Sequence, residues 1–134
     1  MRNVFCVILY ALCIQFSAHI IPGSGTAKKQ NVPTLNLSLN DVPADLAEGI
    51  YACRTSFDVI SDAPAVMHYG PRPVHHLPHS CEVHLLDQII EDAPESISVE
   101  IVSRIRDVQS FEDAEQLRAA IQHDLAQARA ILIA

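Results

Sequence analysis

Leucine and polar residues alternate near the middle of the N-terminal half. In residues 34–40, TLNLSLN, leucine occupies every second position, which is the pattern of a half-buried strand. Residues 49–61 are rich in β-branched and aromatic side chains and predict a second strand. Residues 61–78 contain several prolines and a glycine, which predict a loop because proline cannot donate to a strand ladder.

The apolar spacing becomes helical after residue 78. Ser80 can cap a helix, whose apolar face would be formed by Val83, Leu86, Ile89 and Ile90. A second helix is predicted over residues 92–108. Its apolar residues Ile97, Val99 and Ile101 also fit a strand, and both readings stay open.

Residues 110–132 give the clearest pattern. Ser110 and Asp113 resemble a capping box. An apolar stripe follows at helical spacing, formed by Ala114, Leu117, Ile121, Leu125, Ala128 and Leu132. The expected fold is therefore a small α+β domain with a short N-terminal β element and a predominantly helical C-terminal half of about three helices.

The N-terminus resembles a secretory signal peptide. Arg2 precedes an apolar run, and small residues follow at Gly23, Gly25 and Ala27, so residues 1–27 are expected to be cleaved. An uncleaved anchor is the alternative, because residues 4–21 approach the length of about 20 that spans a bilayer. That alternative describes a small protein tethered to a membrane.

Cleavage would leave a secreted, extracellular chain with no membrane attachment. Residues 28–42 then read as a linker or edge strand, and residues 43–134 as a single small domain. Cys53 and Cys81 would be its only cysteines, which predicts a disulfide in an oxidising compartment. Such a bridge would add roughly 3.5 kcal/mol by restricting the unfolded chain.

The charge balance argues against nucleic acid as a partner. The chain carries 16 acidic and 9 basic residues, a net charge of −7. Binding to phosphate backbones depends on clustered lysine and arginine, and here the basic residues are dispersed along the chain.

Histidines gather in residues 71–84, PRPVHHLPHSCEVH. A low-affinity zinc site is one interpretation, with His75, His76, His79 and His84 as ligands. The spacing matches no zinc signature, so a solvated loop is the main interpretation and no cofactor is predicted. A joint pH response of these histidines is a third interpretation.

Catalytic motifs are sparse. The segment HHLP resembles the start of the ββα-metal nuclease motif, but no asparagine follows Asn40 to complete it. The chain has no glycine-rich phosphate loop, G-x-S-x-G or HExxH motif. The sequence therefore favours a protein that is not an enzyme, with a metal-binding protein or a nuclease-like hydrolase as the alternative.

One further stretch carries a family resemblance. GIYACRTSFDVISDA, with Tyr51, Cys53 and Phe57, resembles the Y-x-C region of candidate effectors from powdery mildews and related fungi. The resemblance covers about fifteen residues and implies a secreted protein that acts by contact. The function predicted from sequence is therefore that of a secreted, effector-like protein that is not a catalyst and acts by binding a macromolecular partner, an unknown protein.

Overall fold

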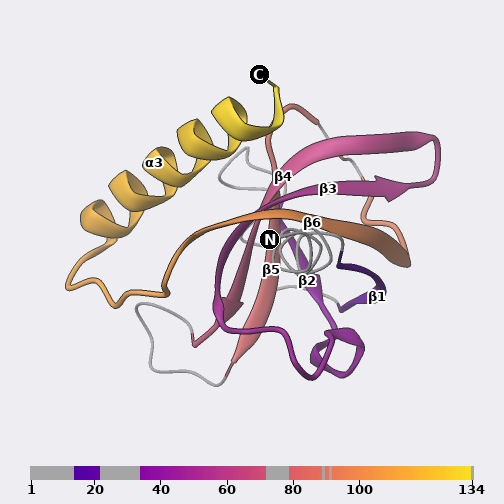
Figure 1. Cartoon of the computed structure of the whole chain (residues 1–134), viewed down its shortest axis with the longest axis horizontal. Coiled ribbons are helices and arrows are strands. Elements are labelled where there is room, and N and C mark those ends of the chain that lie inside the picture. Colours follow the sequence, from indigo (N-terminus) through magenta and orange to yellow (C-terminus); the bar gives the residue numbers. More distant parts are fainter. Residues whose placement is uncertain (1–13, 22–33, 72–78, 89, 91, 134) are drawn as a thin grey trace, which may run out of the picture.

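The computed structural model describes residues 14–21, 34–71, 79–88, 90 and 92–133, which form a closed antiparallel barrel crossed by one helix (Figure 1). The elements are β1 (Gln15–Ile21), β2 (Thr34–Leu37), the short 3-10 helix η1 (Leu39–Asp41), β3 (Gly49–Phe57), β4 (Ile60–Gly70), β5 (Ser80–Leu85), β6 (Ser96–Arg106) and α3 (Ala114–Leu132). Around the barrel the strand order is β1-β2-β5-β4-β3-β6, and β6 pairs with β1 to close it.

Alternating apolar side chains fill the barrel. Leu35 and Leu37 of β2, Val83 of β5, Met67 of β4 and Val99 of β6 are all buried in one cluster. Since successive side chains on a strand point to opposite faces, the residues between them project outward. Closure gives every strand two neighbours in the described residues, although β1 pairs with β2 only at Ile20 and Ile21.

The helix α3 lies across the outside of the barrel, where it packs on β3, β4 and β6 (Figure 1). Asp113 caps it, because its side chain accepts a hydrogen bond from the Gln116 backbone N–H at 2.8 Å. Ala128 is completely buried against Ile50 and Val66. The outer faces of β3 and β4 are therefore apolar beneath the helix.

The prediction of a mostly helical C-terminal half is wrong. Only α3 is an α-helix in the described residues; the segment after Ser80 is strand β5, and most of 92–108 is strand β6. The strand reading of Ile97, Val99 and Ile101 is confirmed, since all three are buried in the barrel core. The helical spacing misled because some outward-facing residues are also apolar, which obscures the period-two pattern.

The loop predicted over residues 61–78 is also wrong for its first part. Ile60–Gly70 forms β4, although Pro64 lies within it. The Pro64 carbonyl accepts a hydrogen bond from the Leu86 N–H at 3.1 Å, just beyond the end of β5. The side of Pro64 that lacks a donor therefore faces the end of a neighbouring strand, where proline is tolerated.

The predicted disulfide is not formed. Cys53 and Cys81 are free thiols in the barrel interior. They lie on β3 and β5, which are separated by β4, and their partners on β4, Ala65 and Tyr69, are four residues apart. The Cα atoms of the two cysteines are therefore separated by two strand spacings of about 4.8 Å each and by the offset along the strands. That separation exceeds the Cα distance of about 7 Å that a disulfide can span.

The segment predicted as a signal peptide includes a strand of the barrel. β1, residues 15–21, pairs with both β2 and β6. Cleavage after residue 27 would remove this strand from the barrel. Cleavage and secretion stay predictions. Within the part of the chain that the structure describes, no helix combines the length and apolar character needed to cross a membrane.

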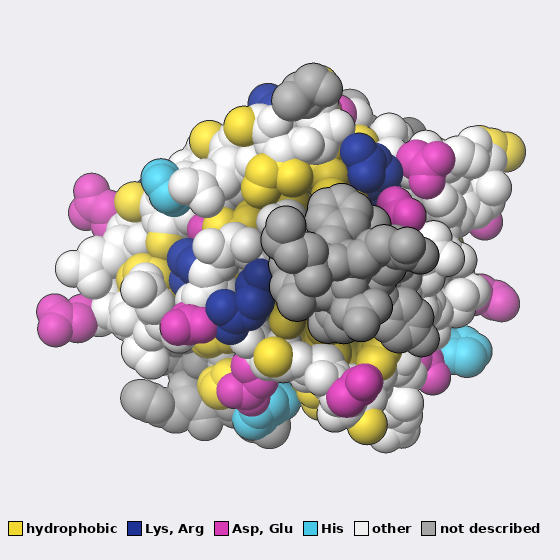
Figure 2. Space-filling view, viewed as in Figure 1, with side chains coloured by type: hydrophobic (Ala, Val, Ile, Leu, Met, Phe, Trp, Pro, Cys, Tyr) yellow, Lys and Arg dark blue, Asp and Glu magenta, His cyan; other side chains and the backbone are white. Residues whose placement is uncertain are grey.

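Charged side chains are dispersed on the face that carries α3. Figure 2 shows acidic side chains around the margin of this face and basic side chains between them, with no single basic patch. The arrangement agrees with the excess of acidic residues in the sequence and lacks the continuous positive surface that phosphate backbones require.

Candidate functional site

A row of five residues crosses the outer face of the barrel beside α3. Asn36 on β2 is in register with Glu82 on β5, Glu82 with His68 on β4, His68 with Ile50 on β3, and Ile50 with Arg106 on β6. We call these five residues the cross-strand row. Because directly opposed side chains lie about 5 Å apart, each member can contact its neighbour.

Several polar atoms in the cross-strand row have no partner. Asn36 Oδ1 and both ring nitrogens of His68 are buried without a hydrogen bond within the described part of the chain. Leaving such atoms unpaired costs about 1–3 kcal/mol each, and in native proteins they usually have a functional or solvent explanation. The cross-strand row therefore has the unpaired polar groups that are expected of a ligand-binding site.

Thr34 and His84 occupy the next position along β2 and β5. They are in register, and the Thr34 Oγ1 lies 3.0 Å from His84 Nδ1. Burial lowers the pKa of His84 to about 4, and the carboxylate of Asp124 opposes this shift. Burial also lowers the pKa of His68, against the effect of Glu82. Both imidazoles are accordingly neutral near pH 7.

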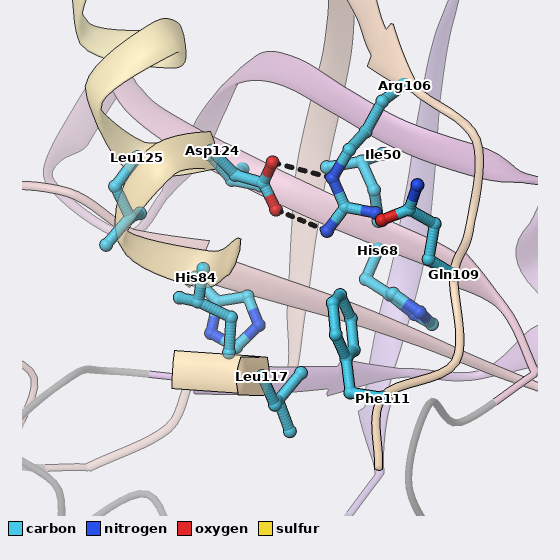
Figure 3. Close-up of a pocket in the computed structure, with 11 residues that line it drawn as sticks. Ile50, His68, His84, Arg106, Gln109, Phe111, Leu117, Asp124 and Leu125 are labelled. Atoms are coloured by element: carbon cyan, nitrogen blue, oxygen red, sulfur yellow. Dashed lines mark hydrogen bonds and ion pairs between the residues drawn. The ribbon is translucent and has the colours of Figure 1, made fainter. Parts of the chain in front are cut away.

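A pocket lies between this face of the barrel and α3 (Figure 3). Its walls comprise Ile50, Val66, His68, His84, Arg106, Gln109, Phe111, Leu117, Ile121, Asp124 and Leu125. The hollow measures about 390 Å³ with the open solvent at its mouth, but the space left for water is only about 30 Å³. It is thus a narrow, mainly apolar slot that joins the cross-strand row.

An ion pair holds the helix over this pocket. Arg106 donates from Nε to Asp124 Oδ1 and from Nη2 to Asp124 Oδ2, both at 2.8 Å (Figure 3). The Asp124 side chain is only 4% exposed. The guanidinium also lies 5.9 Å from the centre of the Phe111 ring. Two parallel hydrogen bonds fix both the position and the orientation of α3.

The donor set near β2 suits a hard cation. Asn36 Oδ1 is buried and unpaired, its neighbour Glu82 is a carboxylate, and the Thr34 hydroxyl lies two residues away on the same face. Mg²⁺ prefers such oxygen ligands and needs only one or two from the protein when phosphates supply others. The described residues contain no group of three His, Cys, Asp or Glu that could hold a metal on their own.

The residues of the predicted zinc site are only partly described. His75 and His76 lie outside the described residues. His79 pairs with Glu48, whereas His84 contacts Thr34, so these two histidines have different partners. The zinc site therefore stays a prediction.

Reasoning from sequence missed Asn36, Glu82 and His68. A signal was present, because Asn36 lies between two leucines, and Glu82 and His84 flank Val83 in a short alternating run. Only the strand register shows that they are neighbours.

Comparisons with known proteins identify a family. The chain matches the family "Flavokinase: Riboflavin kinase" over residues 11–132. It is 30% identical over 116 residues to the riboflavin kinases of Mus musculus and of Homo sapiens, which covers 82% of this chain and 75% of each relative.

Solved structures show the same fold. A macrolide-efflux protein from Streptococcus pneumoniae superposes with a TM-score of 0.73 at 22% identity, covering 91% of this chain but only 40% of that protein. Riboflavin kinase from Trypanosoma brucei superposes with a TM-score of 0.59 at 16% identity, covering 88% of this chain and 78% of the other.

These matches overturn the function predicted from sequence. The resemblance to fungal Y-x-C effectors is wrong, and so is the non-catalytic binding role, since the matched family consists of enzymes. Neither the metal-binding or nuclease-like alternative nor the tethered protein fits better. The prediction of no cofactor is also wrong, because riboflavin kinases use ATP and a divalent metal ion. The chain belongs to the riboflavin kinase family.

Proposed function

We propose that this protein transfers a phosphoryl group from ATP to riboflavin. The observation that carries the proposal is the cross-strand row, in which an unpaired amide oxygen, a carboxylate and an apolar pocket follow one another across three neighbouring strands. Family membership supports the proposal independently.

The β2 end of the row suits the nucleotide and its cation. Asn36 and Thr34 would hold the divalent ion, with Glu82 close by on β5. When bound, the ion would neutralise charge on the transferred phosphate. His84 contributes by holding the Thr34 side chain through the 3.0 Å contact between Nδ1 and Oγ1.

Glu82 is placed to act as the general base. Phosphoryl transfer to an alcohol requires a group that orients the hydroxyl and accepts its proton. Glu82 lies between Asn36 and His68, and no hydrogen bond or ion pair occupies its carboxylate within the described residues. A primary hydroxyl bound between the cation end and the pocket would therefore meet this carboxylate.

The pocket under α3 suits the flavin ring system. Its walls are mainly apolar and include the Phe111 ring, and ligand pockets for aromatic groups have this composition. The slot is too narrow for three fused rings as it stands. Binding of the flavin must therefore displace the Phe111 side chain or the connection between β6 and α3. Local rearrangements of this kind are common when a protein binds its partner.

The test is riboflavin phosphorylation by the full chain with ATP and Mg²⁺, followed by separation of the phosphorylated flavin. Glu82→Gln keeps the size of the side chain but removes the base, and we expect kcat to fall roughly 10²- to 10⁴-fold. Glu95→Gln, at an exposed position outside the row, is the matched control. Absence of product with the unmodified chain, or unchanged kcat in Glu82→Gln, would refute the proposal.

A further inference from the structure

His68 is the polar side chain of the pocket wall whose hydrogen-bonding capacity is unused. Both of its ring nitrogens are buried and lack a partner among the described residues. In Figure 3 it lies at the pocket beside Phe111 and Gln109. The sequence pattern gave no role to this residue, and the phosphoryl-transfer chemistry described above does not use it.

The other polar groups of the wall are accounted for. Arg106 and Asp124 satisfy one another through two hydrogen bonds. His84 contacts Thr34 at 3.0 Å, and Gln109 is exposed to solvent. Among these described side chains, only His68 has buried nitrogens without a hydrogen bond. A ligand that places a hydroxyl beside His68 would supply the missing hydrogen bond and remove the desolvation cost of the unpaired nitrogen.

Position within the row indicates which part of the substrate reaches His68. Neighbouring strands are about 4.8 Å apart. His68 therefore lies one strand spacing from Glu82, and Ile50 lies two strand spacings from Glu82. If the terminal hydroxyl of riboflavin meets Glu82 and the rings enter the pocket near Ile50, the chain between them must pass His68. That chain is a polyol, and its secondary hydroxyls follow the terminal one at successive carbons.

We propose that His68 is a specificity-determining residue that hydrogen-bonds a secondary hydroxyl of the substrate's polyol chain. The inference rests on the proposed kinase function. A neutral imidazole offers one donor and one acceptor, and a hydroxyl can pair with either. The pocket would thereby distinguish a polyol-bearing flavin from a flavin with a plain alkyl chain.

The experiment compares two substrates in two variants. One substrate is riboflavin, and the other is a flavin with a 5-hydroxypentyl chain, which keeps the rings and the terminal hydroxyl but lacks every secondary hydroxyl. We expect the unmodified protein to favour riboflavin in kcat/KM. His68→Leu should lose about tenfold on riboflavin and little on the alkyl substrate, while KM for ATP stays unchanged.

Two further variants separate recognition from folding. His68→Asn restores a donor and an acceptor and should recover part of the preference for riboflavin. His123→Leu changes an exposed histidine of α3 that does not line the pocket, and should behave as the unmodified chain. Thermal unfolding of each variant checks that the fold is retained.

The outcomes are distinguishable. Equal losses on both substrates in His68→Leu, or an unchanged preference for riboflavin, would overturn the role of His68 while leaving the kinase proposal intact. Failure of the unmodified protein to phosphorylate either flavin would instead refute the kinase proposal, and this inference with it.

Discussion

The ion pair between Arg106 and Asp124 offers a direct test of how α3 is held over the pocket. Asp124→Asn removes the charge but keeps the shape of the side chain. Breaking a buried pair from one side costs about 3–5 kcal/mol, because the remaining charge is left uncompensated. Arg106 is 23% exposed and keeps its bond to the Asp107 carbonyl at 2.9 Å, so we expect the lower limit, about 3 kcal/mol.

The assay is urea unfolding followed by circular dichroism, together with thermal unfolding, where we expect Tm to fall by roughly 10 °C. Asp107→Asn is the matched control, because Asp107 is 83% exposed and pairs with Arg104 at the surface; it should change stability by less than about 1 kcal/mol. The double variant Arg106→Met, Asp124→Leu should be more stable than Asp124→Asn, since neither charge is then buried.

Two results would refute this reasoning. A loss below about 1 kcal/mol in Asp124→Asn would show that Arg106 finds solvent or another partner easily. A double variant no more stable than Asp124→Asn would show that packing, rather than an uncompensated charge, sets the cost.

Two other predictions follow from buried groups. The pKa of His84 is about 4 in the folded protein and near 6.5 in the unfolded chain. Between these pH values the unfolded chain therefore binds one proton that the folded protein does not bind. The free energy of unfolding should fall by up to about 3 kcal/mol as pH drops from 6.5 to 4. Urea titrations at several pH values test this, and His84→Gln should flatten the dependence; an equal slope in the variant would contradict it. Burial raises the pKa of Cys81 to about 12 and also raises that of Cys53, so neither thiol should react with a thiol reagent until the protein unfolds. Peptide mapping after labelling checks this, and a Cys53–Cys81 disulfide peptide from the native protein would disprove it.

The local patterns predicted some elements correctly and others wrongly, for identifiable reasons. The alternation around Leu35 and Leu37 and the stripe on residues 110–132 appear as β2 and α3, because each has one buried and one more polar face. β4 and β5 were missed because Pro64 suggested a loop and because Leu86 and Ile90 fit a helical spacing. A strand whose outer face is covered by a helix no longer shows strict alternation.

The candidate site was harder to predict than the fold. The density of histidine in residues 71–84 drew attention to His75 and His76, which lie outside the described residues. The cross-strand row instead joins Asn36, Glu82 and His68, which are far apart along the chain. No spacing rule links them, because their proximity depends on how three strands align.

By itself, the sequence determined the strands 34–37 and 49–57, the final helix and the dispersed charge, although the helix cap is Asp113 and not Ser110 as the capping-box pattern predicted. These features depend on side-chain spacing and local hydrogen bonds, which act between near neighbours. Tertiary structure alone decided the closed barrel, the free thiols, and the meeting of a carboxylate, an unpaired amide oxygen and a half-buried imidazole on one face. Strand register brings those groups together, and it is settled only when the whole barrel closes around its core.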